Sequence, residues 1–306
     1  MIMKTLVNNL LVIVICIIAS TVCASSQTRS KEHSLSPFEG IEASDGFRVS
    51  ITNGNTYNVK LTMNDALESY VECYVKGGVL HLGLDSKKVP KDFKKLFKGK
   101  NSPELTLIAI VTMPVLKSLT LNDESEFYSA SDLAVGDLAI TMSGSSEVNN
   151  LKIFGKSLEL NVAKNARFTN ASVKMENDVK VTTDVKGGVT MECDAANIKI
   201  TGGGSSEINI KGSVDENIAV STTGSSKITL AGKAKAIEVG GKATSSKVDA
   251  SALEVETAVM SIIGVDVDVW SSKSLELDLG KGSEVTFAGD PLIKIIKIQS
   301  ASVLRK

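Results

Sequence analysis

The 306-residue sequence has few aromatic residues, only five prolines and almost no histidine. Aromatic side chains make up 4% of the chain, although hydrophobic residues make up 42%. A thick globular core normally contains more Phe, Tyr and Trp, because each of them buries a large area. The apolar interior must therefore be built from Ile, Val, Leu and Ala, which fits thin and regular layers.

The two histidines are His33 and His81. A histidine-based metal site or a Ser-His-Asp triad needs more of this residue than the chain offers. The charges are also balanced, with 34 basic and 35 acidic residues and a formal net charge of −1. The sequence thus gives no electrostatic reason to expect nucleic acid as a partner, and it indicates no metal or other cofactor.

Residues 1–24 have the organisation of a secretory signal peptide. Lys4 provides a positive start, residues 10–19 form an apolar run, and small residues precede a cleavage site near Ser25. The run is short for a spanning helix, and we expect no membrane span in the mature chain. Lipidation of Cys23 is the less favoured alternative, because Val22 is a poor residue before a lipidated cysteine. We expect an exported protein of the periplasm, the outer membrane or the cell surface.

The mature chain keeps two cysteines, Cys73 and Cys193, each within a strand-like segment. A disulfide between them is one alternative in an exported protein. The interpretation that we favour is two small buried apolar side chains.

The first part of the mature chain predicts short strands. Residues 25–37 are polar and predict a flexible lead-in. From residue 38 onward, apolar and polar residues alternate, and the turn signals at 53–55 (Asn-Gly-Asn) and 76–78 (Lys-Gly-Gly) predict hairpins. We therefore expect an antiparallel β meander over residues 38–104, with an insertion at 86–103.

This insertion is rich in lysine, with seven between positions 87 and 100 and one acidic residue, Asp92. Phe93, Leu96 and Phe97 fall at helical spacing, which predicts a short amphipathic turn. A solvated, mobile loop is one interpretation. The other is a basic patch for acidic glycans or lipid headgroups. The candidate binding residues of that patch are Lys91, Lys94, Lys95 and Lys98.

From about residue 105 the sequence repeats itself with a period of about 20 residues. A Ser-Ser pair followed by one charged and one apolar residue recurs at 145–148, 205–208, 225–228 and 245–248. Apolar pairs two positions apart recur at a similar spacing, for example Ile198 with Ile200 and Ile218 with Val220. Both side chains of such a pair point to the same face of a strand. Two strands per repeat, separated by Gly/Ser turns, are typical of a solenoid.

The predicted fold class is therefore all-β. We expect a single-stranded β-helix, or solenoid, of about 20 residues per coil over residues 105–306. The antiparallel β meander precedes it and is expected to be continuous with it in one domain. A leucine-rich repeat does not fit, because its L-x-x-L-x-L-x-x-N frame is absent. Independent hairpins do not fit either, since they would not keep the turn in a fixed register.

The recurring serines of the turns allow two interpretations. Stacked hydroxyl groups could hydrogen-bond from coil to coil, or they could form a polar stripe that binds sugar. The serines concerned are Ser146, Ser206, Ser226 and Ser246.

Asp266 and Asp268 are the best candidates for the carboxylate pair of a polysaccharide-cleaving enzyme, because they point to one face of a strand. No further carboxylate can be assigned to their neighbourhood, so a solvent-facing strand edge explains them better. We expect no enzymatic activity.

Several motifs resemble one bacterial family. Residues 38–41 (FEGI), 45–51 (DGFRVSI) and 79–82 (VLHL), together with the SGSS and TGSS turns at 143–146 and 223–226, resemble the "putative autotransporter adhesin, head GIN domain" family. The resemblance covers nearly all of the mature chain. It implies an exported β-helical protein with an adhesive role, and it brings no catalytic residues.

The sequence thus predicts an exported, non-catalytic binding or adhesion module. Its solenoid surface would meet a glycan or protein partner at the cell envelope. A structural scaffold of the envelope is the alternative, and a polysaccharide-active β-helix enzyme is a weaker one.

Overall fold

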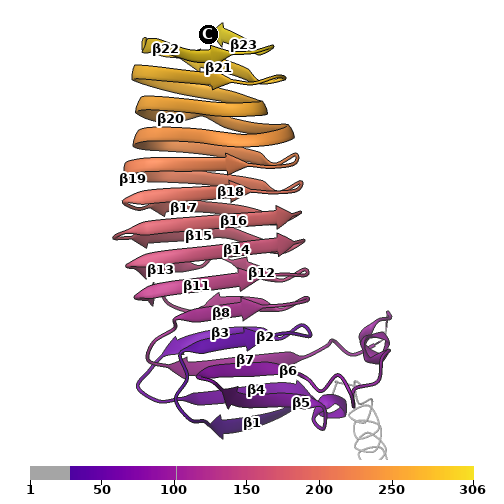
Figure 1. The fold of residues 1–306 in the computed structure, drawn as a ribbon. Coiled ribbons are helices and arrows are strands. Elements are labelled where there is room, and N and C mark those ends of the chain that lie inside the picture. Colours follow the sequence, from indigo (N-terminus) through magenta and orange to yellow (C-terminus); the bar gives the residue numbers. More distant parts are fainter. Residues whose placement is uncertain (1–27, 101) are drawn as a thin grey trace, which may run out of the picture.

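A computed structural model describes residues 28–100 and 102–306, so the expected signal peptide and Cys23 lie outside the described residues. The described chain forms a rod, with a small N-terminal body at one end and a stack of coils above it (Figure 1). Its helices are two short 3₁₀ turns, η1 (Asp65–Leu67) and η2 (Phe93–Phe97). No helix within residues 28–100 and 102–306 is long and apolar enough to cross a membrane.

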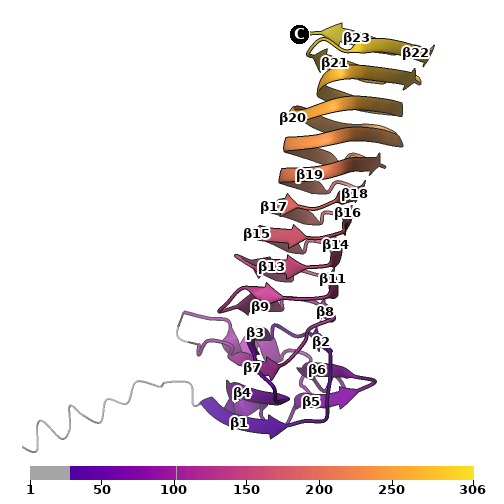
Figure 2. The same cartoon turned by 90° about the vertical axis from the view of Figure 1, so that its left-hand side faces the viewer.

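Parallel, in-register stacking of strands builds the rod. The solenoid has about nine coils, and the coil length of about 20 residues is the one that the sequence predicted. Two views at right angles show its two long faces (Figures 1 and 2). The strands of the first face are β8 (Ser118–Leu121), β11 (Asp137–Met142), β14 (Ser157–Lys164), β16 (Asp178–Val185), β18 (Asn197–Gly202) and β22 (Leu292–Ile298).

The strands of the second face come directly after the Gly/Ser turns. They are β9 (Glu126–Ser129), β12 (Glu147–Asn149), β17 (Gly188–Asp194), β21 (Glu284–Ala288) and β23 (Ser302–Arg305). The short strands β10 (Leu133–Ala134) and β13 (Lys152–Gly155) close the early coils. Longer strands run on through the corners of the coils, namely β15 (Arg167–Met175), β19 (Glu207–Thr222) and β20 (Lys227–Leu279).

Alternating side chains of each strand point inward and stack on the same position of the next coil. On the first face Ile198 pairs with Ile218, and Ile200 pairs with Val220. The second face has one continuous apolar column, in which every side chain is at most 1% exposed. Its members are Val148, Phe168, Val189, Ile208 and Ile228. These columns confirm the register that the sequence repeat predicted.

One coil was not identified in the sequence, where the series of apolar pairs passes from Ile237 and Val239 directly to Leu275 and Leu277. Ala258, Met260 and Ile262 fill its interior and are at most 1% exposed. The irregular spacing of the repeat therefore reflects a change of residue type, and the stack continues.

The second serine of each Ser-Ser turn is buried, at no more than 2% exposure. The Thr183 hydroxyl donates to Ser206 Oγ over 2.8 Å, and the hydroxyls of Ser226 and Ser246 lie 3.2 Å apart. The hydroxyl of Ser146 has no hydrogen-bond partner in the described chain. The interpretation that the hydroxyl groups hydrogen-bond from coil to coil therefore holds for three of the four serines. The alternative prediction of a polar stripe that binds sugar is wrong, because these hydroxyls are not accessible.

The turn before the serine has a left-handed backbone in five successive coils, from Gly144 to Gly224. Gly204 has a φ of 61°, and a Cβ atom added there would lie 2.7 Å from the backbone nitrogen of Val185. Lys164 and Val185 hold the equivalent positions of earlier coils, with φ of 60° and 58°. A left-handed conformation costs an L-residue roughly 1–2 kcal/mol, so stacking with neighbouring coils must hold these two residues in place.

The N-terminal body contains the expected antiparallel strands. β1 (Thr28–Ser34) pairs with β4 (Asn58–Asn64), and β4 pairs with β7 (Leu107–Met113). β5 (Val71–Lys76) and β6 (Val79–Leu84) form the hairpin that was predicted at 76–78.

Parallel pairing joins this body to the first coil. β2 (Gly40–Ala43) lies between β6 and β8, and β3 (Arg48–Asn53) lies between β7 and β9. The ladders of both faces therefore run without a break from the body into the solenoid.

The hairpin predicted at 53–55 is wrong. β7 lies between β3 and β4, pairing in parallel with the first and antiparallel with the second. The Asn-Gly-Asn turn is present, but the strand that follows it, β4, does not pair with β3, because β7 occupies the position between them. Gly54 N donates to Met113 O over 3.2 Å. A turn signal predicts a change of direction and does not determine which strand fills the gap.

The prediction of a flexible lead-in is also wrong for residues 28–34, because they form β1. Six of its seven side chains are exposed, so it has none of the apolar alternation by which strands are predicted. Backbone pairing with β4 holds it in place, and Arg29 and Lys31 both form ion pairs with Glu68, at 2.8 and 2.6 Å. His33 lies in this strand, and His81 lies in β6.

Both cysteines are free thiols: Cys193 is buried in β17, and Cys73 is half-buried in β5. Burial raises the pKa of Cys73 to about 11, and burial together with the charge of Asp194 raises the pKa of Cys193 to about 12. The favoured interpretation, that each cysteine is a small buried apolar side chain, is thus confirmed for Cys193 and holds in part for Cys73.

We predict that replacing Ile228 with Asp lowers the free energy of unfolding by roughly 4 kcal/mol, because the carboxylate would be buried without a partner. Ser226→Ala should cost only about 1 kcal/mol, the value of a single hydrogen bond. Urea denaturation of both variants measures the difference. Wild-type stability of the Asp variant would contradict the register of the apolar column.

We also predict that neither thiol reacts quickly in the folded protein at pH 8, because few molecules carry the reactive thiolate. A thiol-specific reagent should modify Cys73 slowly and Cys193 only after unfolding. Mass spectrometry of the protein, denatured without reductant, should count two thiols per chain; a mass two hydrogens lower would reveal a disulfide.

Candidate binding site

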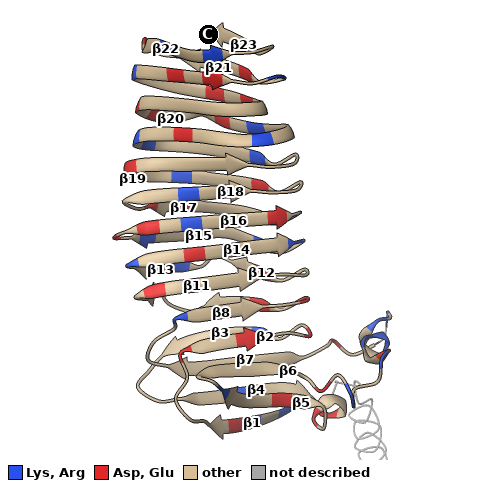
Figure 3. Ribbon diagram, in the orientation of Figure 1, with Lys and Arg blue, Asp and Glu red and all other residues tan. Residues whose placement is uncertain are grey.

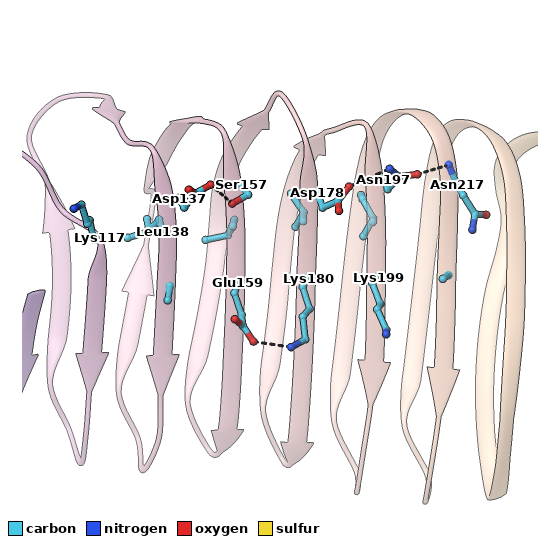
Figure 4. Close-up of a pocket in the computed structure, with 15 residues that line it drawn as sticks. Lys117, Asp137, Leu138, Ser157, Glu159, Asp178, Lys180, Asn197, Lys199 and Asn217 are labelled. Atoms are coloured by element: carbon cyan, nitrogen blue, oxygen red, sulfur yellow. Dashed lines mark hydrogen bonds and ion pairs between the residues drawn. The ribbon is translucent and has the colours of Figure 1, made fainter.

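An open groove with a volume of about 710 Å³ crosses the first face of the solenoid. Figure 4 shows its residues on successive coils from β8 to β19. We call it the first-face groove. Its polar lining residues are Lys117, Asp137, Ser157, Glu159, Asp178, Lys180, Asn197, Lys199 and Asn217.

The first row of the groove follows the starts of the strands, where each coil contributes one small polar side chain (Figure 4). Ser157 Oγ donates to Asp137 Oδ1 over 2.6 Å, and Asn197 Nδ2 donates to Asp178 Oδ1 over 3.0 Å. The backbone nitrogen of Asn217 donates to Asn197 Oδ1 over 3.3 Å. The row ends where Ala236 takes the same position in the next coil. These contacts fix the orientation of the side chains.

The second row lies two residues further along each strand and carries charge. Lys180 Nζ lies 2.6 Å from Glu159 Oε1, and this hydrogen bond lowers the pKa of the Glu159 carboxyl. Lys199 follows Lys180 on the next coil and has no ion-pair partner among the described residues. Ala139 and Ala219 hold this position at the two ends of the groove.

The strand segments between the two rows form the floor of the groove. Leu138, Leu158, Val179 and Ile198 lie there, but their side chains point inward and are at most 3% exposed. Hydrogen-bond donors and acceptors therefore stand in two parallel rows on the outer surface of the strands and repeat at the coil spacing of about 4.8 Å. Such an arrangement can hold an extended polymer by repeated, similar contacts.

Sequence reasoning missed this groove, although a signal for it is present. The residue just before each apolar pair of the first face is small and polar in five successive coils. The sequence analysis used the apolar pairs to set the register and did not follow the outward positions between them.

A second open groove, of about 460 Å³, lies on the second face. Thr190, Asn209 and Thr229 line it together with the charged Glu192 and Lys211. It has fewer charged residues than the first-face groove.

The lysine-rich insertion projects to the side of the N-terminal body (Figure 1), and two contacts tie it to the rest of the protein. Phe93 begins η2 and is buried, and Lys94 Nζ donates to Glu124 Oε2 of the first coil over 2.8 Å. This hydrogen bond and the nearby charges of Lys94 and Lys98 lower the pKa of the Glu124 carboxyl. The expected short turn is thus present at residues 93–97, with Phe93 buried and Phe97 half-buried, but Leu96 is 60% exposed.

The four candidate lysines have different surroundings. Lys94 is held by Glu124, and Lys95 lies 3.1 Å from Asp92 in an exposed pair. Lys91 and Lys98 are exposed, and no described residue forms an ion pair with them. The insertion therefore presents Lys91, Lys95 and Lys98 to solvent.

The sequence profile of the family described as "Putative auto-transporter adhesin, head GIN domain" matches residues 37–218 and, in an overlapping second match, residues 170–291. The chain belongs to this family. The overlap of the two matches fits a fold in which one coil stacks on the next in the same way. No curated protein matches the chain.

Solved structures similar to this head GIN protein include proteins of Parabacteroides species. One is described as a "Putative lipid binding protein" from Parabacteroides distasonis; it is 18% identical, with 92% of this chain and 97% of that chain covered and a TM-score of 0.44. Another is a "putative adhesin" from Parabacteroides merdae, 16% identical, with 92% and 96% covered and a TM-score of 0.39.

Of the two carboxylates singled out in the sequence, Asp266 and Asp268, the second forms ion pairs. Asp268 lies 3.1 Å from Lys247 and 3.9 Å from Lys306. The hydrogen bond to Asp268 raises the pKa of the Lys247 ammonium group, with smaller contributions from Asp249 and Asp266. Within the described ranges, no three His, Cys, Asp or Glu side chains are grouped so that they could hold a metal ion.

Charges of both signs are spread over the coils of this head GIN protein (Figure 3). Lys235 with Glu216, Lys273 with Glu256 and other outward pairs bridge neighbouring coils. Exposed ion pairs of this kind contribute about 0–1 kcal/mol each, so they mainly keep the surface polar and free of large single-sign fields.

Proposed function

We propose that this head GIN protein is an exported, non-catalytic adhesion module that binds an extended, hydroxyl-rich glycan in the first-face groove. The observation that carries the proposal is the in-register polar row from Asp137 to Asn217. Membership of the adhesin family supports the adhesive role.

The chemistry of the groove suits neutral or weakly charged sugar chains. Carboxylate and amide oxygens accept hydrogen bonds from sugar hydroxyls, and amide and ammonium groups donate to them. Asp137 and Asp178 each accept a hydrogen bond from a neighbouring coil, and Glu159 is paired with Lys180. The groove thus offers many weak polar contacts and no concentrated charge. A sugar chain that lies along the rod would meet the same contacts coil after coil and gain affinity from their number.

We predict that replacing Asp178 and Asn197 together with Ala weakens glycan binding roughly 10-fold or more, because two adjacent coils lose their polar contacts. Both side chains are outward, so the fold should be retained. A glycan array identifies the ligand, and isothermal titration calorimetry with that ligand measures the change.

The matched control is Asn209→Ala with Thr229→Ala in the second-face groove. It removes similar side chains from adjacent coils on the opposite face. If the control variant loses binding and the Asp178/Asn197 variant keeps it, the glycan binds elsewhere. If no glycan binds and the wild-type protein co-purifies with an envelope protein, the scaffold role is correct.

We further propose that the insertion holds the module close to an anionic surface through Lys91, Lys94, Lys95 and Lys98. The Lys94–Glu124 bridge and buried Phe93 support this role, because they keep the insertion in a fixed position with three lysines facing outward. Each lysine near an anionic surface contributes about 1 kcal/mol, and the effect decays over a Debye length of roughly 8 Å at physiological salt. The surface would be acidic glycan or lipid of the envelope.

We predict that changing these four lysines to Gln abolishes most binding to anionic envelope fractions at low salt. Co-sedimentation measures it. A control variant carries Lys152, Lys174, Lys211 and Lys233 as Gln, which changes the net charge equally on the coils. Equal binding by wild type and the insertion variant would show that the insertion is only a solvated edge.

A further inference from the structure

The first-face groove continues beyond Asn217. A further depression on the same face, of about 240 Å³, begins at Lys199 and Ala219, which line both. It leads past Ser221 to Ser261 of β20, and Ser261 in turn lines another depression, of about 500 Å³. Because each depression shares lining residues with the next, the three form one track along the outer surface of the first face.

Gly240 keeps this track open between the groove and the depression at Ser261. It pairs with the outward Ser221 of the preceding coil, so its own position faces outward. A Cβ atom added to Gly240 would meet only two backbone oxygens within 4 Å, Ser261 O at 3.8 Å and Val220 O at 4.0 Å. A glycine inside a strand is typical of a place where a ligand can come close to the backbone. A chain that lies on the track can therefore pass this point.

The depression of about 500 Å³ carries positive charge without partners, and we call it the basic pocket. Lys242, Lys281 and Lys297 line it and are exposed, and none of them forms an ion pair with a described residue. Asp278 is the one carboxylate of the described lining, and it lies beside Lys297 on the neighbouring coil. Three ammonium groups against one carboxylate attract an anionic ligand.

The basic pocket also has an apolar wall. Ile263 lines it and is 43% exposed. Its side chain lies over Gly280 of the next coil, where an added Cβ atom would be 2.5 Å from Ile263 Cγ1. Ligand pockets commonly combine apolar walls with a few polar groups that fix orientation. A sugar ring has apolar C–H faces, so an anionic sugar suits this lining better than a small inorganic anion does.

We propose that the glycan of the first-face groove carries an anionic sugar unit, and that the basic pocket holds the carboxylate or phosphate of that unit. The inference rests on the proposed function, because it extends the same ligand along the same track. The uncharged part of the chain lies over the polar row from Asp137 to Asn217, and the anionic unit lies at Lys242, Lys281 and Lys297. The charged unit thereby fixes the direction in which the glycan runs along the rod.

A glycan explains the place of the basic pocket better than a lipid surface does. The pocket lies on the side of the rod, in line with the groove, and shares Ser261 with the track. The neighbouring lysines of β20 and β22 are neutralised: Lys273 lies 2.6 Å from Glu256, and Lys294 lies 2.7 Å from Glu276. A membrane surface attracts broad clusters of unpaired lysine and arginine, whereas here the excess charge is confined to one pocket.

The test uses glycans whose charge can be removed without changing the chain. An array presents uronic-acid glycans in native and carboxyl-reduced form, and phosphate-substituted glycans before and after dephosphorylation. All proteins are full-length exported chains with the four insertion lysines as Gln, so the insertion does not contribute. We expect the native form of the bound glycan to bind roughly 10-fold or more tightly than its uncharged form, because charge-assisted hydrogen bonds are lost. The pair that shows the difference distinguishes carboxylate from phosphate.

Changing Lys242, Lys281 and Lys297 together to Gln should remove this preference. The variant should bind both forms with the affinity that the unaltered pocket has for the uncharged form. The three side chains are exposed, so circular dichroism and thermal melting should be unchanged. Changing the same three residues to Arg keeps the charge and should keep the preference. Higher salt should weaken binding of the native form and leave the uncharged form unaffected.

The matched control carries Lys152, Lys186 and Lys227 as Gln. These lysines are also exposed, form no ion pair with a described residue and lie outside the three depressions of the track. The control changes the net charge by the same amount, and it should keep the preference for the native form.

Four results would overturn the inference. If the two forms bind equally and Asp178→Ala with Asn197→Ala still weakens both, the groove binds a glycan and the basic pocket takes no part. If the Gln variant of the pocket loses the preference but the Asp178/Asn197 variant binds like wild type, the pocket holds an anion by itself and the ligand does not follow the track. If no glycan binds, the proposed function fails as well. Binding of phosphatidylglycerol vesicles that only the pocket variant loses would identify a lipid site instead.

Discussion

Backbone hydrogen bonds between consecutive coils hold this protein together, and they also decide which residues of different coils lie side by side. Because the pairing is parallel and in register, position for position, every strand repeats the same division between inward and outward side chains. A shift of one residue in any coil would expose its apolar residues and bury its charged ones. The apolar columns, the buried serines and the polar row of the groove all follow from this constraint. Few aromatic residues are needed, since each layer is only one strand thick.

This dependence explains why so much of the solenoid could be predicted from the sequence. Ile208 and Ile228 follow the same Ser-Ser turn in successive repeats, and the structure places them on each other. The prediction failed where pairing is not periodic. β7 joins β3 and β4 although the hairpin of β5 and β6 and the whole insertion separate it from them in the chain, and no local pattern indicates so distant a partner. The prediction for β1 failed for another reason: backbone pairing and exposed ion pairs hold this strand, and neither requires the apolar alternation by which strands are predicted.

The candidate site was less accessible to sequence reasoning. The lysines of the insertion could be identified, because a run of like charge is visible in any sequence. Their arrangement could not, since the bridge from Lys94 to Glu124 joins residues 30 positions apart. The groove was hidden in a different way. Asp137, Ser157 and Asp178 look like ordinary surface residues one by one, and only the register brings them into one row.

The left-handed residue of each turn has a consequence for how such a rod changes in length. Five successive coils turn through the same left-handed position, at Gly144, Lys164, Val185, Gly204 and Gly224, and the chain enters the next coil in an equivalent place each time. Duplication or deletion of one repeat would therefore lengthen or shorten the rod by about 4.8 Å without disturbing either end. The length of the rod and the chemistry of its ends can therefore change independently. Evolution or protein design can alter the distance between the N-terminal body and the opposite end by adding or removing repeats, while the residues at both ends stay the same.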